Sequence, residues 1–325
     1  MQRESQHGTP AQKRHPARYH SRRFARFAGL PQLRRISTGL AAVMLAAALV
    51  GCSSLRLGYT FADTYLNYTL GTSFDLDDTQ TALVRARVQA LRDWHRTTQL
   101  PDYIAYLERL QATFGDPAGA GGPSAGQWRA ADVLNVQREF NTRLLLIGEH
   151  AAPDLAQLAL SLRPAQIDAF AAKLGRDAAK ARAEAARRDT LDARVEHTVE
   201  QIENWAGALN GAQINVIRQA LANAPDLQAL WLEERERRDR DLLALLRDVI
   251  RDPPQQPVVA RRLQDYFKQI EQPTEPARGA RVKQRREAYA AMLAPVINRM
   301  TAEQRTAMQR KLRGYAEDLA ALAAD

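Results

Sequence analysis

Apolar residues recur at spacings of three and four along most of this chain, which is the period of one face of an amphipathic helix. Ala, Leu, Arg, Gln and Glu dominate the composition, and no alternating apolar run of strand length stands out. The pattern predicts an all-α fold, an elongated bundle of long antiparallel amphipathic helices that hide their apolar faces against one another. The clearest stretch contains Val133, Val136, Phe140, Leu144 and Ile147.

A five-residue pattern marks four expected helix starts: an apolar residue, a small polar residue, two variable positions and Gln. In such a capping box the polar side chain accepts a bond from the Gln amide, and the Gln side chain returns to the amide of the polar residue. Arg163 departs from the pattern, because arginine has no acceptor, so a weaker cap is expected there. The copies lie at 76–80, 162–166, 209–213 and 300–304.

The four copies start 86, 47 and 91 residues apart, near one or two units of about 45, the size of a helical-hairpin repeat. Internal duplication of a hairpin is one interpretation, and a simple likeness among helix starts is the other, which we favour. The copy at 300–304 resembles the Leu-Thr-x-x-Gln signature of the Spy/CpxP group of periplasmic chaperones.

Residues 36–50 are uncharged and mostly apolar, and they follow the basic pair Arg34-Arg35. Fifteen helical residues span about 22 Å, less than the ~30 Å of a hydrocarbon core. A basic region followed by a short apolar run is typical of a secretory signal. The alternative is an uncleaved, short transmembrane anchor.

Leu49, Val50, Gly51 and Cys52 resemble the lipobox of bacterial lipoproteins. The resemblance implies cleavage before Cys52, diacylglycerol on its sulfur and an acyl group on its new amino terminus. Cys52 is the sole cysteine, so no internal disulfide competes for it. Ser53 stands where the inner-membrane retention signal of that family has Asp, which implies a periplasm-facing position on the outer membrane.

The expected processing also changes the charge of the chain. Residues 1–35 carry nine basic side chains and one acid, and residues 52–325 carry 37 basic and 36 acidic ones. The mature protein is therefore almost neutral, which speaks against nucleic acid as a partner.

Three regions follow from these signals. We expect residues 1–51 to be a disordered extension plus a signal peptide that is removed. Residues 52–75 are expected to be a lipidated tether leading to a short apolar helix. Residues 76–325 are expected to form a single helical domain with a flexible loop at 115–126, which contains five of the seventeen glycines.

A longer set of motifs resembles an uncharacterised family of proteobacterial lipoproteins. The motifs are the lipobox, the tyrosines at 59 and 65–68, and residues 74–76, 91–96, 100–103 and 203–213. The resemblance implies a helical lipoprotein and supplies no activity.

Catalytic and metal-binding signatures are scarce in the mature chain. Of its three histidines, only His197 has acids at zinc-like spacing, Glu196 and Glu200, and it lacks a second histidine. No phosphate loop or nucleophile elbow occurs. We therefore expect no enzyme, no metal and no cofactor other than the lipid on Cys52.

Two charged regions call for an interpretation. Residues 233–241 are all charged and offer acid-first i,i+4 pairs, as expected for a solvated or bundle-bridging helix. For the basic cluster we favour a solvated face, and contact with anionic lipid or peptidoglycan acids is the alternative. That cluster comprises Arg278, Arg281, Lys283, Arg285 and Arg286.

Aromatic and charged side chains suggest one candidate groove, although the aromatic ones are more simply core anchors. The chain is then a non-catalytic interaction or scaffold protein of the envelope, with the bilayer and an envelope protein as partners. A chaperone-like binder of unfolded envelope proteins is the second hypothesis, and an unrecognised enzyme is the third. The groove residues are Trp94, His95, Arg96, Tyr103, Arg194, Glu203 and Trp205.

Overall fold

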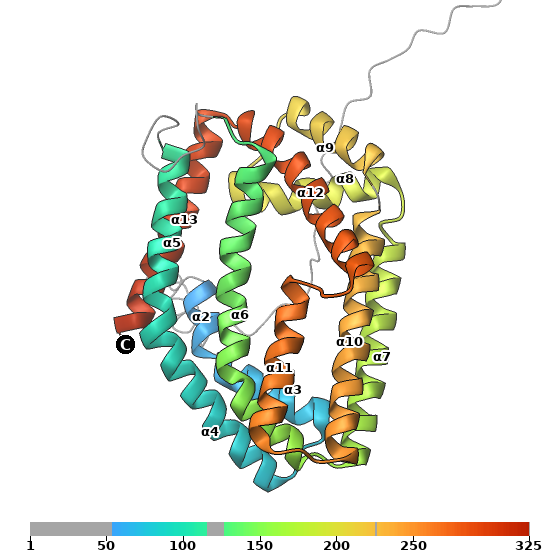
Figure 1. The fold of residues 1–325 in the computed structure, drawn as a ribbon. Coiled ribbons are helices and arrows are strands. Elements are labelled where there is room, and N and C mark those ends of the chain that lie inside the picture. Colours follow the sequence, from blue (N-terminus) through green and yellow to red (C-terminus); the bar gives the residue numbers. More distant parts are fainter. Residues whose placement is uncertain (1–53, 116–126, 225, 325) are drawn as a thin grey trace, which may run out of the picture. The chain divides into compact units, whose positions relative to one another are not determined.

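The computed structural model describes residues 54–115, 127–224 and 226–324, and every element within these ranges is a helix (Figure 1). The all-α prediction is therefore confirmed. The signal and lipobox predictions, Cys52 included, lie outside the described residues. The loop predicted at 115–126 does so too, except for Gly115, which is the last residue of α5. By its internal contacts the chain divides into residues 1–51 and 52–325, and the description below concerns the second unit.

The helices follow one another with short connections. In chain order they are α2 (Ser54–Thr60), α3 (Ala62–Phe74), α4 (Asp78–Trp94), the π-helical turn η1 (His95–Gln99), α5 (Leu100–Gly115), α6 (Ala130–Ser161), α7 (Pro164–Ala186), α8 (Leu191–Ala206), α9 (Gly211–Asn223), α10 (Leu227–Arg251), α11 (Gln256–Glu271), α12 (Pro276–Asn298) and α13 (Ala302–Ala324).

Residues 52–75 were expected to be a tether leading to a short apolar helix, and within the described residues α2 and α3 make the segment helical from Ser54 onward. The backbone amide of Phe61 donates to Leu57 at 3.2 Å, and that of Tyr65 donates to Phe61 at 2.9 Å, so helical bonding crosses the junction. Tyr59 of α2 packs against the buried cluster around Leu100. These inward contacts give the segment the tertiary support that a short helix needs.

The two halves of the unit repeat one packing scheme. In the first half α3 contacts α4 and α7, and α4 contacts α6; in the second half α8 contacts α9 and α13, and α9 contacts α12. Each half also extends a helix along the other, α5 beside α13 and α10 beside α7 (Figure 1). The repeated packing favours duplication of a whole half of the unit, which is a larger unit than the hairpin considered from the sequence.

Helix α11 stands outside this scheme and packs along α6. Gly148 of α6 makes the close approach possible, because a Cβ atom there would lie 2.9 Å from Cγ of Phe267. The contact helps to complete a buried cluster that contains Val249, Val259 and Leu263.

A pair of buried glutamines joins α4 to α7, and we call Gln80 and Gln166 the N-terminal node. The Gln166 Nε2 donates to Gln80 Oε1 at 2.7 Å, and the return bond is 3.2 Å long. The same two amides also donate to the carbonyls of Asp75 and Ser161, at 2.9 and 2.7 Å. Each accepting carbonyl lies five residues before the other glutamine.

A second pair joins α9 to α13 in the same way, and we call Gln213 and Gln304 the C-terminal node. Their side chains exchange bonds of 2.9 and 3.1 Å. They donate to the carbonyls of Arg299 and Ala208 at 3.2 and 2.6 Å, again five residues before the partner. The spacings of 86 and 91 residues therefore separate partners within a node.

The capping boxes behind these nodes are confirmed. Asp77, Asn210 and Thr301 accept bonds from the amides of their glutamines at 2.9, 3.0 and 3.2 Å. Arg163 accepts nothing with its side chain, as predicted, and its Nη1 instead donates to Asp77 Oδ2 at 2.6 Å. Arg163 at the start of α7 therefore contacts Asp77, the N-cap residue of α4.

The charged run at 233–241 mostly bridges helices, and one of its ion pairs, Arg237–Asp241 at 3.9 Å, lies along α10. Arg278 of α12 is only 4% exposed and binds Glu234 at 2.7 Å and Asp241 at 3.2 Å. The acid-first i,i+4 pairs that the run offers, Glu233–Arg237, Glu234–Arg238 and Glu236–Arg240, give way to contacts with neighbouring helices, because those helices present opposite charges. These contacts are Glu233–Arg281, Glu236–Arg182 and Arg237–Glu275.

The basic cluster on α12 is likewise not a solvated face throughout. Arg278 is buried, and Arg286 binds Glu271 of α11 at 2.7 Å. Carboxylates of the same chain thus form ion pairs with several arginines of the cluster, which leaves fewer of them available to an external anion.

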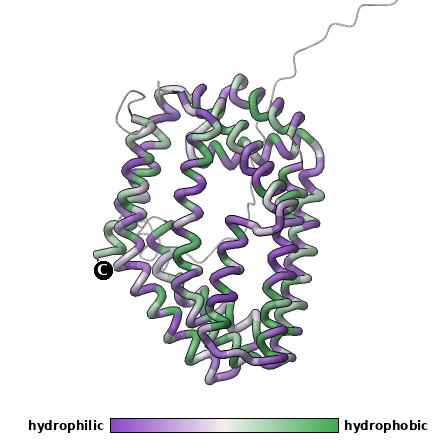
Figure 2. Tube along the Cα trace, viewed as in Figure 1, coloured by the Kyte–Doolittle hydropathy of each residue, from purple (hydrophilic) through white to green (hydrophobic). Residues whose placement is uncertain are grey.

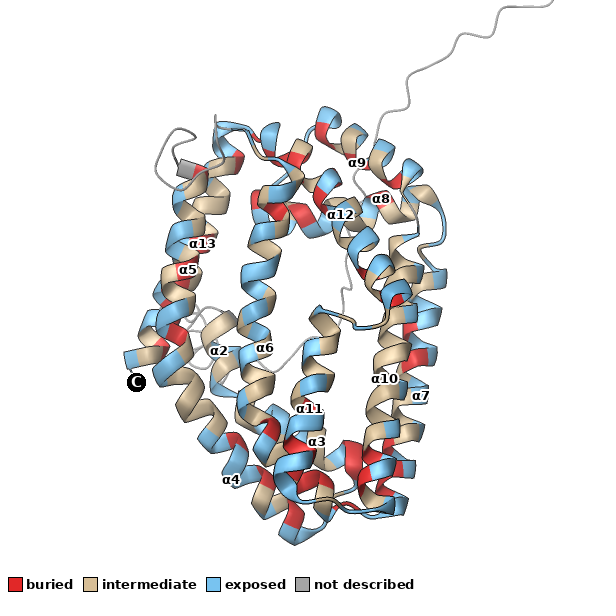
Figure 3. Ribbon diagram, in the orientation of Figure 1, coloured by how far each residue is buried: buried red, intermediate tan, exposed pale blue. Residues whose placement is uncertain are grey.

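Hydrophobic and hydrophilic residues alternate along the helices (Figure 2). The buried residues gather mainly toward the two ends of the long helices (Figure 3). Within the described ranges, no helix combines the length and the hydropathy needed to cross a bilayer.

Candidate functional site

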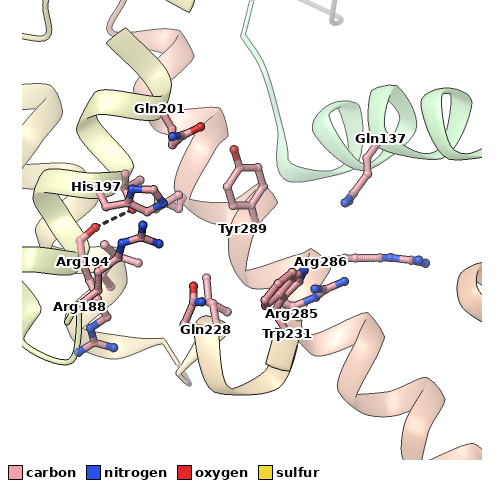
Figure 4. Close-up of a pocket in the computed structure, with 14 residues that line it drawn as sticks. Gln137, Arg188, Arg194, His197, Gln201, Gln228, Trp231, Arg285, Arg286 and Tyr289 are labelled. Carbon is pink, nitrogen blue, oxygen red and sulfur yellow. Dashed lines mark hydrogen bonds between the residues drawn. The ribbon is translucent and has the colours of Figure 1, made fainter. Parts of the chain in front are cut away.

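A cavity of about 430 Å³ opens where α8, α9, α10 and α12 meet near α6 (Figure 4). Its volume falls in the range of small-molecule sites, roughly 300–1,000 Å³. We call it the arginine cavity, because four guanidinium groups line it: Arg188, Arg194, Arg285 and Arg286.

These arginines reach the cavity from two sides. Arg188 precedes α8 and Arg194 lies on it, whereas Arg285 and Arg286 belong to α12. Arg286 is paired with Glu271. Within the described part of the chain, the other three form no ion pair, and the Nε of Arg194 is buried without a hydrogen-bond partner.

Burial imposes an electrostatic cost on Arg285. Desolvation, with the guanidiniums of Arg286 and Arg238 nearby, lowers the pKa of Arg285 from its ordinary value. Arginine stays protonated in proteins, so the cost appears as a positive potential rather than as proton loss. An anion in the cavity would relieve it.

The remaining lining is apolar, aromatic or neutral. Trp231 and Tyr289 flank the arginines, and Leu221, Leu227 and Met292 supply apolar surface. Desolvation raises the pKa of Tyr289, although 42% of this residue is exposed. The other lining residues are Gln137, His197, Thr198, Gln201 and Gln228.

The predicted groove residues do not form one site. Trp94, His95 and Tyr103 do lie close together. The Trp94 ring stacks on His150 with centroids 3.7 Å apart. His95 Nδ1 lies 3.2 Å from the Tyr59 hydroxyl, and its ring lies 5.3 Å from that of Tyr103. This cluster joins η1 to α2 and α5.

Electrostatics within this cluster follow from burial. Desolvation lowers the pKa of His95 and raises that of Tyr59, while the guanidiniums of Arg92 and Arg96 oppose the shift at Tyr59. The cluster favours neutral side chains, as expected of an interhelical contact.

The second predicted group is divided. Arg194 lines the arginine cavity. Glu203 instead accepts a bond from the Leu209 amide at 2.8 Å, and Trp205 packs edge-on against Tyr315 of α13 at 5.7 Å. Glu203 and Trp205 therefore hold the α8–α9 turn and the α8–α13 contact.

Sequence reasoning did not assemble the cavity, although it noted several of its members separately. Arg194, His197 and Gln201 share one face of α8, and Arg285, Tyr289 and Met292 share one face of α12, by their i,i+3 and i,i+4 spacing. That spacing was the available signal. It does not say that the two faces meet.

A second cavity, of about 310 Å³, lies between α3, α4 and α6. Its lining is mostly aliphatic and includes Leu66, Leu70, Val88 and Ile147. Among the described residues, no cluster of three potential metal ligands occurs.

Residues 72–272 match the sequence profile of a family described as being of unknown function (DUF6279). The match runs from the end of α3 to the end of α11, so it includes the N-terminal node and excludes α12 and α13. No curated protein and no solved structure matches the chain.

Proposed function

The chain belongs to this family of unknown function, and we propose that it is an outer-membrane lipoprotein that faces the periplasm. Acyl chains on Cys52 hold it at the bilayer. Its helical domain binds an anionic amphiphile in the arginine cavity and leaves it chemically unchanged. This is an interaction role, with the cavity as the binding surface.

The observation that carries the proposal is the set of three guanidiniums without carboxylate partners around one cavity. Hydrogen bonds to charged groups contribute about 1.5–3 kcal/mol each, roughly twice a neutral bond. Arginine suits planar recognition of carboxylate or phosphate oxygens. The chemistry of the lining therefore selects an oxyanion.

The apolar part of the cavity selects what the oxyanion is attached to. Trp231, Leu227 and Met292 provide surface for an alkyl chain or a flat group beside the charged head. Apart from the arginines, the titratable groups among the described lining residues are His197 and Tyr289. No described carboxylate or thiol lines the cavity, which supports binding over catalysis.

Calorimetric titration of the full-length protein with octyl phosphate tests the binding proposal. We expect saturable binding that Arg285→Gln weakens roughly ten-fold or more, since 1.4 kcal/mol corresponds to ten-fold. Arg187→Gln is the matched control, because Arg187 is exposed and does not line the cavity. Trp231→Ala should weaken octyl phosphate more than inorganic phosphate.

Two results would overturn the binding proposal. One is equal affinity for octyl phosphate and for the neutral octyl glucoside. The other is an Arg285→Gln protein that folds normally and binds as tightly as the Arg187→Gln control.

The anchor is tested separately by labelling growing cells with palmitate. Labelled protein should sediment with the outer membrane, and Cys52→Ser should remove the label, the lipid mass and the sedimentation. A Cys52→Ser protein with unchanged mass and fractionation excludes the lipoprotein proposal.

A second candidate function is favoured by the aliphatic cavity between α3, α4 and α6. Such a surface suits apolar segments of an unfolded envelope protein. If this is its role, the protein suppresses client aggregation, and Leu66→Asp abolishes the effect whereas Val258→Asp on α11 does not. Equal suppression by both variants rejects this function.

A further inference from the structure

An exposed apolar stripe runs along α2 and α3. Leu57, Phe61, Tyr65 and Tyr68 are 55%, 56%, 67% and 69% exposed. Large apolar side chains so exposed in one continuous row mark an interaction surface more often than scattered single ones do. We call these four residues the aromatic stripe.

Helical geometry places the stripe on one side only. At 3.6 residues per turn its members fall within an arc of about 80°. Leu55, Tyr59 and Leu70 lie on the opposite side, where they pack against the buried clusters of the domain. The segment therefore has apolar residues on its outward side as well as on the side that packs against the domain.

The stripe is held firmly by the domain behind it. The Tyr59 hydroxyl lies 3.2 Å from His95 Nδ1, and Asp63 of α3 binds Arg92 of α4 at 2.7 Å. Both contacts lie away from the exposed arc. They hold the inner side of α2 and α3 against the domain, which leaves the aromatic stripe on the outer side.

The composition of the stripe fits the boundary between lipid and water. Tyr and Trp are enriched at that boundary, where a ring contacts acyl chains and its polar edge stays hydrated. Interfacial helices bury an apolar face about 5–10 Å deep. The stripe itself carries no charge, and the flanking charged residues Arg56 and Asp63 are both only partly exposed.

The position of the stripe in the chain identifies the bilayer as its occupant. Leu57 follows Cys52 by five residues, which extended chain can span over at most about 18 Å. An acylated Cys52 therefore keeps Leu57 and Phe61 close to the headgroups. We infer that the aromatic stripe inserts into the bilayer surface and fixes the orientation of the helical domain, an inference that rests on the proposed acylation of Cys52.

Spin labels test this inference in the mature protein, reconstituted in phosphatidylethanolamine–phosphatidylglycerol vesicles. The acylated Cys52 has no free thiol, and it is the sole cysteine, so Tyr65→Cys and Tyr68→Cys each take one label. We expect oxygen to relax both labels more strongly than a water-soluble nickel chelate does. Val258→Cys is the control, because Val258 is 43% exposed on α11, outside the stripe, and its label should favour the chelate.

The inference is overturned if labels at 65 and 68 favour the nickel chelate as strongly as the label at 258. Spin–spin broadening at 65 and 68 that disappears on dilution with unlabelled protein also overturns it, because the stripe then faces a second copy. Tyr65→Ser with Tyr68→Ser should shift the label at Phe61→Cys toward the chelate.

The mass of each labelled protein keeps the two proposals apart. A second label, on Cys52, shows that the proposed acylation is wrong. The depth measurement is then repeated in the full chain with Cys52→Ser, which retains residues 36–50 to hold it on the vesicle. Immersed labels in that chain support the stripe without the acyl anchor, and exposed labels reject it.

Discussion

The two glutamine nodes make the same hydrogen bonds with different caps. In the N-terminal node the residues three before the glutamines are Asp77 and Arg163, which bind each other at 2.6 Å. In the C-terminal node they are Asn210 and Thr301, both neutral, and each caps its own helix. The geometry of the nodes therefore depends on the glutamines and the carbonyls, whereas the caps set how each node responds to charge.

Removing a node glutamine has the largest expected effect. Gln213 is 0% exposed and Gln80 is 3% exposed. Their replacement by Ala leaves an amide and carbonyls without partners, at about 1–3 kcal/mol for each buried group. We expect Gln213→Ala and Gln80→Ala each to lower the free energy of unfolding by about 3 kcal/mol, measured by urea denaturation.

Gln219→Ala on α9 is the control for these variants, because Gln219 is exposed. The equivalence of the nodes fails if one Gln→Ala variant is as stable as this control while the other is not.

Coupling between glutamines is the next largest effect. Gln80→Ala and Gln166→Ala remove the same contact, so their double variant should lose less stability than the sum, by about 1 kcal/mol. Gln80→Ala with Gln304→Ala should be additive, since those residues belong to different nodes. The proposed nodes are contradicted if Gln80→Ala and Gln166→Ala are additive while Gln80→Ala and Gln304→Ala are coupled.

The caps should contribute less than the glutamines. Asn210→Ala removes a side chain that accepts a backbone amide bond, which costs about 1 kcal/mol. Arg163→Ala removes an exposed ion pair and no cap, so its unfolding midpoint in urea should fall less than that of Asn210→Ala. The reverse order would mean that Arg163 does more than bind Asp77.

Charge gives the smallest and most specific effect. Arg163, together with the amide of Gln80, holds the pKa of the Asp77 carboxyl below its ordinary value. The folded state therefore gains stability from ionised Asp77 at any pH well above the unfolded value, near ~3.9, and loses it as the pH falls through the lower folded pKa. Wild type should exceed Asp77→Asn in thermal midpoint at pH 7, and the two should converge below about pH 4.

The C-terminal node supplies the control for this measurement. Asn210→Ala should shift the midpoint by a similar amount at pH 7 and pH 3, because neither residue titrates. The hydroxyl of Thr301 lowers the pKa of Glu303, so Glu303 also contributes a pH dependence at this node. The Asn210→Ala comparison is therefore made in proteins that also carry Glu303→Gln. A gap between wild type and Asp77→Asn that does not narrow as the pH falls from 7 to 2 contradicts the proposed role of the carboxylate.

Structural features that depend on neighbouring residues were predictable, and the structure has them at the predicted positions. The capping boxes at Asp77, Asn210 and Thr301 depend on residues three apart, and such contacts form wherever the helix starts. The helical period of the apolar residues is local for the same reason. The sequence did not say where the tether ends and helix begins in residues 52–75, because the helix at 54–60 depends on inward contacts of Leu55 and Tyr59 with distant helices.

Long-range choices were not predictable in the same way. The acids of α10 had partners available one turn away, yet Glu234 binds Arg278, 44 residues later. The arginine cavity likewise requires that one face of α8 meets one face of α12. Each such choice depends on which helices become neighbours.

The amino-acid order thus specifies the helices, their caps and the chemistry available on each helical face, since these depend on residues within a turn or two of one another. Folding in three dimensions selects which glutamines pair, which arginines remain without a carboxylate and which aromatic rings stay exposed. The physical reason is that burial and pairing are properties of two surfaces in contact, and a linear pattern describes each surface alone.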